Sequence, residues 1–176
     1  CDVRSLDLGY MMGDSIESEI AFIERTGTKH YGLQTDMSQF QNKPSCIRMR
    51  SGLRHAGYSP AEAEAIAEEL FQYCSENGRE AWIAYTMEHY PKVAADKHSF
   101  FFHFHANDPR RMYEIIPYLF HMHGKFYEMT EIPGHPGQYE DRSLPYPEVI
   151  KHLKKSGWNG YIHSEFEGQR SQQDMG

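Results

Sequence analysis

Cysteine is scarce in this chain, and the sequence contains neither a long apolar run nor a CxxC pair. Its 176 residues include three cysteines, an odd number that argues against a disulfide framework or a zinc knuckle. No apolar run approaches the about 20 residues of a membrane-spanning helix, and no signal-peptide pattern opens the chain. We therefore expect no membrane partner and, by default, a cytoplasmic protein.

An excess of basic residues is also absent. Lysine and arginine number 18 against 25 aspartates and glutamates, giving a formal net charge of −7. Phosphate backbones need a basic patch, so we expect no nucleic-acid partner. Eleven histidines in a mildly acidic chain fit small-molecule or metal chemistry better.

The composition is nevertheless that of a folded protein. Hydrophobic residues make up 39% and aromatic residues 14%, which supports one sizeable core, and we expect a single domain over residues 1–176. The chain starts with Cys1 instead of methionine, and only a polar tail follows Glu167. We expect both ends to be cut.

Local signals predict the helices of the N-terminal half. A capping box at Asp14–Glu17 opens a helix that Gly27 ends, and a second at Ser59–Glu62 opens a helix that Gly78 stops. A further helix over residues 79–90 follows before Pro91. The stretch between residues 37 and 58 is read as irregular.

Strands and helices then alternate. Strands are predicted at residues 31–36, 121–127 and 160–166, with helices opened by Asp108-Pro109 and by Pro147. Such alternation is typical of an α/β protein with a parallel sheet.

Two of these strands carry rows of polar side chains. Side chains two apart in a strand share a face, which places His121, His123 and Lys125 together. The same spacing aligns His163, Glu165 and Glu167. Strands seldom give a whole face to such groups unless a cation or polar substrate lies against it.

Three groups sit at or near the carboxyl ends of predicted parallel strands, where α/β proteins place their sites: Asp36, His123 and Glu165. One imidazole and two carboxylates suit Mn²⁺, Mg²⁺, Co²⁺ or Zn²⁺. A divalent ion there can stabilise an enediolate while a nearby carboxylate removes a proton from the adjacent carbon.

Each group also has a simpler interpretation. Asp36 alone can cap a turn, a lone histidine can be a satisfied core residue, and Glu165 can belong to a solvated strand end. For Lys125 a salt bridge is a simpler role than a Schiff base. The pair His103 and His105 alternates with phenylalanine, which fits a half-buried strand or loop.

The runs 117–129 and 156–168, with the shorter segment 146–150 between them, resemble the seventh-strand to eighth-strand part of the xylose-isomerase-like TIM barrels, a family of sugar phosphate isomerases and epimerases. Residues 27–28 and 32–40 resemble the sixth-strand segment. The resemblance implies an α/β fold that is the C-terminal portion of a (β/α)₈ barrel, incomplete because such barrels need about 250 residues.

The resemblance also implies a metal site. The family holds its ion through Glu, Asp, His and Glu on four successive strands, and Asp36, His123 and Glu165 match the last three. Glu17 and Glu19 lie in a predicted helix, so the first ligand is expected upstream of Cys1 or to be lost. Mn²⁺ is the expected ion, with Mg²⁺, Co²⁺ or Zn²⁺ as alternatives.

The resemblance further suggests roles around this ion. Glu165 carries the acid/base role, and Gln39, Lys125 and Glu167 face the substrate, while His121 and His163 are supporting groups. Gln39 stands where epimerases of the family have a histidine, which argues against simple ketose 3-epimerase activity.

The expected function is therefore a metal-dependent isomerase or epimerase of a sugar or polyol, working through an enediolate-type intermediate. One alternative is the larger subunit of a C-glycoside-cleaving lyase, because the segments 123–127 and 164–168 carry signatures that occur in such subunits. Another is an inactive fragment with a degenerate sugar pocket. An abasic-site endonuclease is disfavoured by the acidic charge. A homo-oligomer or a partner subunit is compatible with each enzyme reading.

Overall fold

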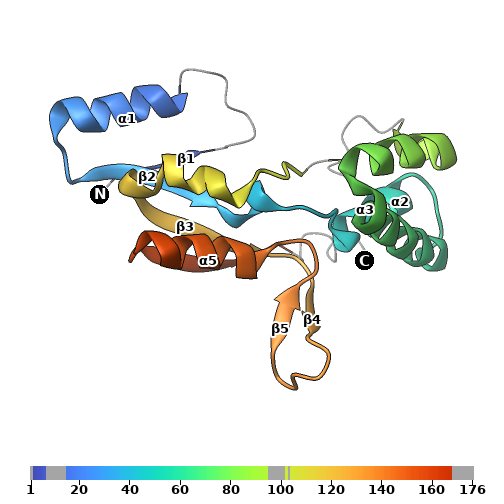
Figure 1. The fold of residues 1–176 in the computed structure, drawn as a ribbon. Coiled ribbons are helices and arrows are strands. Elements are labelled where there is room, and N and C mark those ends of the chain that lie inside the picture. The colour runs from blue at the N-terminus through green and yellow to red at the C-terminus, as the bar shows by residue number, and fades with distance from the viewer. Residues whose placement is uncertain (1, 7–14, 95–101, 103, 168–176) are drawn as a thin grey trace. The chain divides into compact units, whose positions relative to one another are not determined.

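The computed structural model describes residues 2–6, 15–94, 102 and 104–167, which separate into two compact units (Figure 1). The first unit comprises Cys1–Gln41, His105–Lys125 and Pro145–Glu165. The second unit comprises Asn42–Phe104, Phe126–Leu144 and Phe166–Gly176. Among the described residues, no helix is both long enough and apolar enough to cross a membrane.

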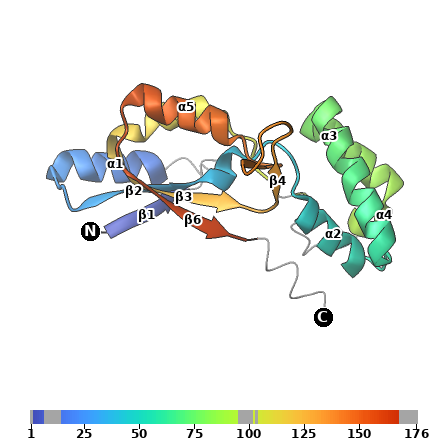
Figure 2. The ribbon, with the colours of Figure 1, turned by 90° about the horizontal axis from the view of Figure 1, so that it is seen from below.

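A four-stranded sheet forms the centre of the first unit. Its strands, labelled in Figure 2, lie in the hydrogen-bonded order β1 (Asp2–Leu6), β2 (Tyr31–Asp36), β3 (Leu119–Phe126), β6 (Tyr161–Phe166). β1 pairs with β2 and β2 pairs with β3, both in parallel. The register sets Asp36 opposite His123.

Helix α5 (Tyr146–Ser156) packs along this sheet (Figure 2). Its buried face carries Val149, His152 and Leu153, an i, i+3, i+4 pattern that matches one side of a helix. Gly157 ends the helix in the left-handed conformation, with φ of 71°. The remaining helices of this unit are α1 (Ser15–Thr26) and the 3₁₀ segments η1 (Met37–Phe40), η3 (Pro109–Glu114) and η4 (Ile116–Tyr118).

Gly124 lets β6 approach β3 closely. A Cβ atom at this position would lie 2.7 Å from Ile162 Cγ2 and 3.3 Å from the backbone oxygen of His163. Both distances are shorter than ordinary van der Waals contact, so a side chain here would press β6 away. The glycine between His123 and Lys125 therefore keeps the two polar strands together.

The second unit is mainly helical. It contains α2 (Cys46–His55), α3 (Pro60–His89), α4 (Pro91–Ala94) and a hairpin of β4 (Met129–Glu131) and β5 (Tyr139–Asp141). Ser59 and Glu62 form both hydrogen bonds of a capping box at the start of α3. Gly78, with φ of 83°, kinks this helix in a conformation that side chains with a Cβ rarely adopt.

An apolar core holds α2 and α3 together. Leu53, Leu70 and Trp82 are fully buried within it. The thiols of Cys46 and Cys74 belong to the same cluster and are free. Burial raises the pKa of Cys46 to about 12 and that of Cys74 to about 11. Both thiols therefore act as small apolar side chains and are not reactive nucleophiles.

A single carboxylate organises the chain around the hairpin. Asp141 Oδ2 accepts hydrogen bonds from the backbone N–H groups of Tyr127 at 2.6 Å and Glu128 at 3.1 Å. Asp141 Oδ1 accepts from those of Ser143 at 2.8 Å and Leu144 at 3.1 Å. The carboxylate is buried, and these four donors replace the water it lost.

The predicted fold class, an α/β protein forming the C-terminal portion of a (β/α)₈ barrel, is wrong. The described residues form one four-stranded sheet and a separate two-stranded antiparallel hairpin. The interval between β2 and β3 holds α2 and α3, which share an apolar core of their own. The barrel prediction rests on the resemblance of short segments, and such a resemblance does not report which core each helix joins.

Most local predictions are confirmed. The strand at residues 31–36 has the predicted bounds, α1 ends before Gly27, and the break at Gly78 is present. The capping role of Asp14 lies outside the described residues. The reading of residues 37–58 as irregular is wrong, because Ser45 caps a ten-residue helix there. The helix predicted after Asp108 is present as two 3₁₀ segments, η3 and η4, with Pro117 inside η4.

Replacing Asp141 with alanine is expected to lower the free energy of unfolding by about 3 kcal/mol or more, because buried backbone donors lose their acceptor. Chemical denaturation of the purified protein measures this. Asp141→Asn keeps one carbonyl oxygen and should lose less. Glu140→Ala, at the exposed neighbouring position, should change stability by under about 0.5 kcal/mol. Equal effects of Asp141→Ala and Glu140→Ala would contradict the anchoring role.

Candidate metal and carboxylate site

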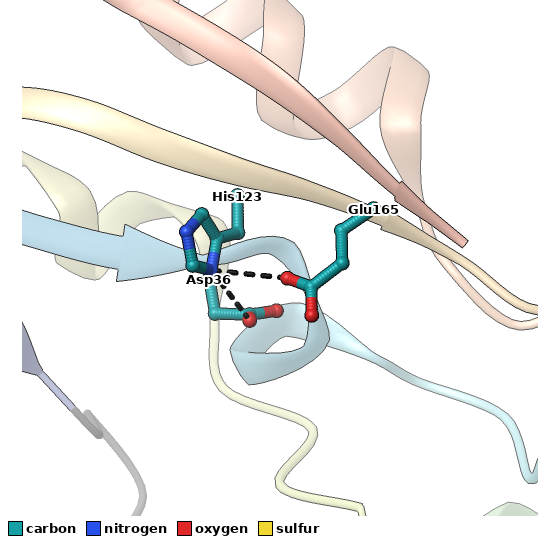
Figure 3. Close-up of side chains that lie close together, drawn as sticks. All are labelled: Asp36, His123 and Glu165. Atoms are coloured by element: carbon teal, nitrogen blue, oxygen red, sulfur yellow. Dashed lines mark ion pairs between the residues drawn. The ribbon is translucent and has the colours of Figure 1, made fainter. Parts of the chain in front are cut away.

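Asp36, His123 and Glu165 meet in the first unit, on one side of its sheet (Figure 3). Asp36 is the last residue of β2, His123 lies within β3, and Glu165 lies near the end of β6. One ligand atom from each lies within 4.8 Å of the others. The three residues that the sequence places at or near strand ends are therefore close together in the folded chain.

His123 stands between the two carboxylates. Its Nδ1 lies 3.1 Å from Glu165 Oε2 and 3.7 Å from Asp36 Oδ2, the two dashed lines of Figure 3. The other oxygen of Asp36 accepts a hydrogen bond from Ser38 N at 2.8 Å and so caps η1. The Asp36 carboxylate is therefore held by its local turn, with Oδ2 turned to the cluster.

Lys125 supplies the positive charge of the cluster. Its Nζ lies 3.3 Å from Asp36 Oδ2 and 3.0 Å from Glu165 Oε1. The Lys125 side chain is only 13% exposed, so its ion pair with the equally shielded Asp36 is screened little by water, whereas Glu165 is 33% exposed. The salt-bridge interpretation of Lys125 is confirmed.

A second row of polar groups continues from His123 along the same strands. His121 Nδ1 lies 3.1 Å from Gln34 Oε1, and the Nε2 of His121 contacts His163 Nδ1. Gln34 Nε2 lies 3.2 Å from Nδ1 and 3.0 Å from Nε2 of His123, so this amide is within hydrogen-bonding distance of both ring nitrogens. Gln34 thus links His121 to His123.

Burial and two neighbouring histidines lower the pKa of His121. Burial lowers it, because the charged form loses its hydration, and the imidazoles of His163 and His123 lower it further. His121 is therefore neutral over a wider pH range than an exposed histidine.

Gln39 and Glu167, the other two residues predicted to face the substrate, contact groups outside the three-residue cluster. Gln39 is buried in η1, and its backbone oxygen accepts from Asn107 N at 3.1 Å. Glu167 belongs to the second unit, where Arg48 donates to its Oε2 at 2.9 Å. Substrate binding by Gln39, Lys125 and Glu167 stays a prediction.

The donor set fits a divalent cation. Metal–ligand distances of about 2.0–2.2 Å place neighbouring ligand atoms roughly 3 Å apart, close to the separations seen around His123 Nδ1. Glu165 Oε2 is buried, and apart from its approach to His123 it has no hydrogen-bond partner in the described part of the chain. Three protein ligands and open positions are typical of catalytic ions. Metal binding and the choice of Mn²⁺ stay predictions.

Sequence reasoning missed Gln34 and Arg48. Gln34 lies two residues before Asp36 in the strand, so the period-2 rule that aligned the histidines would have found it. Arg48 carried no such signal, since its helix was read as irregular chain. Of the pair His103 and His105, His103 lies outside the described residues.

No family model matches this chain. Parts of it are similar to curated enzyme subunits. A C-glycoside deglycosidase alpha subunit of Arthrobacter globiformis is 33% identical over 60 residues, which is 34% of this chain and 15% of that protein. A 3'-dehydrocarminate deglycosidase alpha subunit of Microbacterium sp is 39% identical over 54 residues, 31% of this chain and 14% of that protein.

A third relative, the C-glycoside deglycosidase alpha subunit of Microbacterium trichothecenolyticum, is also 39% identical over 54 residues, 31% of this chain. The three matches span 13–15% of the relatives' own lengths. The chain is thus similar to subunits of carbohydrate-active enzymes. These relatives agree with the C-glycoside-cleaving alternative and give no support to the isomerase or epimerase interpretation.

Titration of His121 tests the second row of polar groups. In metal-free protein, the imidazole resonance should titrate at a lower pH than that of an unstructured histidine, and His163→Ala should move it upward. Because the folded pKa lies below the unfolded value of about 6.5, acid favours the unfolded chain and stability falls as the pH drops through that value. NMR measures the midpoint. An unchanged midpoint in His163→Ala would show that the two rings do not interact.

Proposed function

We propose that the protein containing this chain is the alpha subunit of an enzyme that cleaves C-glycosides. The similarity to deglycosidase alpha subunits from two bacterial genera carries this proposal. The cluster of Asp36, His123 and Glu165 supports it, because cleavage of a carbon–carbon bond needs groups that move a proton and stabilise an oxyanion.

The proposed substrate is a C-glycoside whose sugar carries a ketone. The name 3'-dehydrocarminate, printed for one relative, describes a substrate of that kind. A ketone at C3' makes the hydrogen on C2' acidic, because the resulting carbanion spreads onto the ketone oxygen. The electron pair then forms a C1'–C2' double bond. The bond from C1' to the aglycone carbon breaks, and that carbon leaves with the bonding electrons and takes up a proton.

Glu165 is the proposed proton-transfer group. Its Oε1 faces the Lys125 ammonium and its Oε2 faces His123, so its two oxygens have separate partners. Asp36, His123 and Glu165 would hold a divalent cation, with Mn²⁺ the first choice. That cation, when bound, supplies positive charge for the oxygen that becomes an enolate.

Lysis and isomerisation share the first step. Both begin by removing a proton beside a carbonyl, and they differ in whether a carbon–carbon bond then breaks. The relatives favour lysis. Interconversion of an aldose and a ketose without aglycone release would instead favour the isomerase interpretation.

A partner subunit belongs to the proposal. The relatives are named alpha subunits, so we infer that this protein works with a second polypeptide. Co-expression with a neighbouring open reading frame and co-purification would support this inference. A fully active protein without any partner would contradict it.

Replacing His123 with alanine should raise the Kd for Mn²⁺ by about 100-fold or more and abolish most aglycone release, because one of three ligands is lost. Calorimetry measures the Kd, and chromatography of a 3'-oxo C-glucoside reaction measures release. The matched control is His55→Ala, which removes an exposed imidazole from the second unit and should leave both quantities unchanged.

Two outcomes would contradict the proposal. If the wild-type protein with its partner releases no aglycone and binds no divalent ion, the inactive-fragment interpretation applies. If aglycone release persists in His123→Ala and Glu165→Gln, the cluster is not the site.

A further inference from the structure

Lys125 occupies the position that a cation would take between the two carboxylates. Its Nζ lies 3.3 Å from Asp36 Oδ2 and 3.0 Å from Glu165 Oε1, two of the oxygens that face the cluster. The side chain comes from β3, two residues after His123, and is largely shielded from water. Lys125 therefore contacts the same groups as the proposed metal.

The negative charges of Asp36 and Glu165 explain why a positive group such as the Lys125 ammonium is needed between them. Two carboxylates this close together repel each other, and burial strengthens that repulsion. The Lys125 ammonium offsets one of the two negative charges. Without it, the metal-free protein would hold two closely spaced carboxylates, one largely buried and one partly buried, with no ammonium to offset their charge, which is unfavourable.

The same charge opposes a metal. A divalent ion on Asp36 and Glu165 brings two positive charges to oxygens that Lys125 already contacts. The ammonium and the ion repel each other, so the ion binds at the expense of the lysine contacts. We propose that Lys125 is a built-in counter-ion that holds the metal-free site together and, by competing with the divalent cation for Asp36 and Glu165, sets its metal affinity.

This inference rests on the proposed metal site, but it concerns the affinity of that site for Mn²⁺ and not the rate of aglycone release. Lys125→Met removes the charge and keeps an unbranched apolar stem. We expect metal-free Lys125→Met to melt at a lower temperature than wild type, because the carboxylates lose their counter-ion. We expect it to bind Mn²⁺ about 10-fold more tightly, because the competing cation is gone. Lys125→Arg, which keeps the charge, should stay within about threefold of wild type.

The experiment combines calorimetric titration of Mn²⁺ with thermal melts of the protein after treatment with a chelator. The matched control is Lys154→Met, which removes an exposed lysine of α5 and should alter neither quantity. Equal or weaker Mn²⁺ binding by a folded Lys125→Met protein would overturn the inference while leaving the metal site standing. Absence of Mn²⁺ binding by the wild-type protein would overturn both proposals.

A measurement on the wild-type protein keeps the inference testable if Lys125→Met does not fold. Displacement by the metal should free the ammonium from both carboxylates. Acetylation of Lys125 by a small amine-reactive reagent, followed by mass spectrometry, should therefore become faster when Mn²⁺ saturates the protein. The rate at Lys154 should not change. A rate at Lys125 that is unchanged or slower with Mn²⁺ would contradict displacement.

Discussion

Parallel hydrogen bonding between β2 and β3 is the interaction on which the candidate site depends. Its register sets Asp36 opposite His123, and β6 on the other side of β3 adds Glu165. Residues from positions more than a hundred apart in the chain thereby reach one sheet face. Gly124 supports this arrangement, because a side chain at that position would force β6 away from β3.

The two units stabilise carboxylates in two different ways. Asp141 accepts hydrogen bonds from four backbone N–H groups, which hold its loop in place. Asp36 and Glu165 instead share a lysine and a histidine. Backbone donors are fixed by the fold and cannot be exchanged, whereas a lysine side chain can leave. The first arrangement suits a structural anchor and the second suits a site where another cation binds.

The chemistry of the cluster alone does not separate an isomerase from a lyase. Both need a carboxylate that takes a proton beside a carbonyl and a positive charge for the developing oxyanion. The deglycosidase relatives decide the preference for lysis, although each match covers about a third of the chain.

The sequence by itself predicted most of the local elements and the three residues that form the cluster. The capping box at Ser59, the break at Gly78 and the row His121, His123, Lys125 follow from interactions within a few residues, which local spacing reports. Only the tertiary structure decided that the described residues form a four-stranded sheet and a separate hairpin, and that Lys125 contacts both carboxylates. Those outcomes depend on which core each helix joins and on which distant strands pair. The spacing of residues along the sequence predicts neither the helix packing nor the strand pairing.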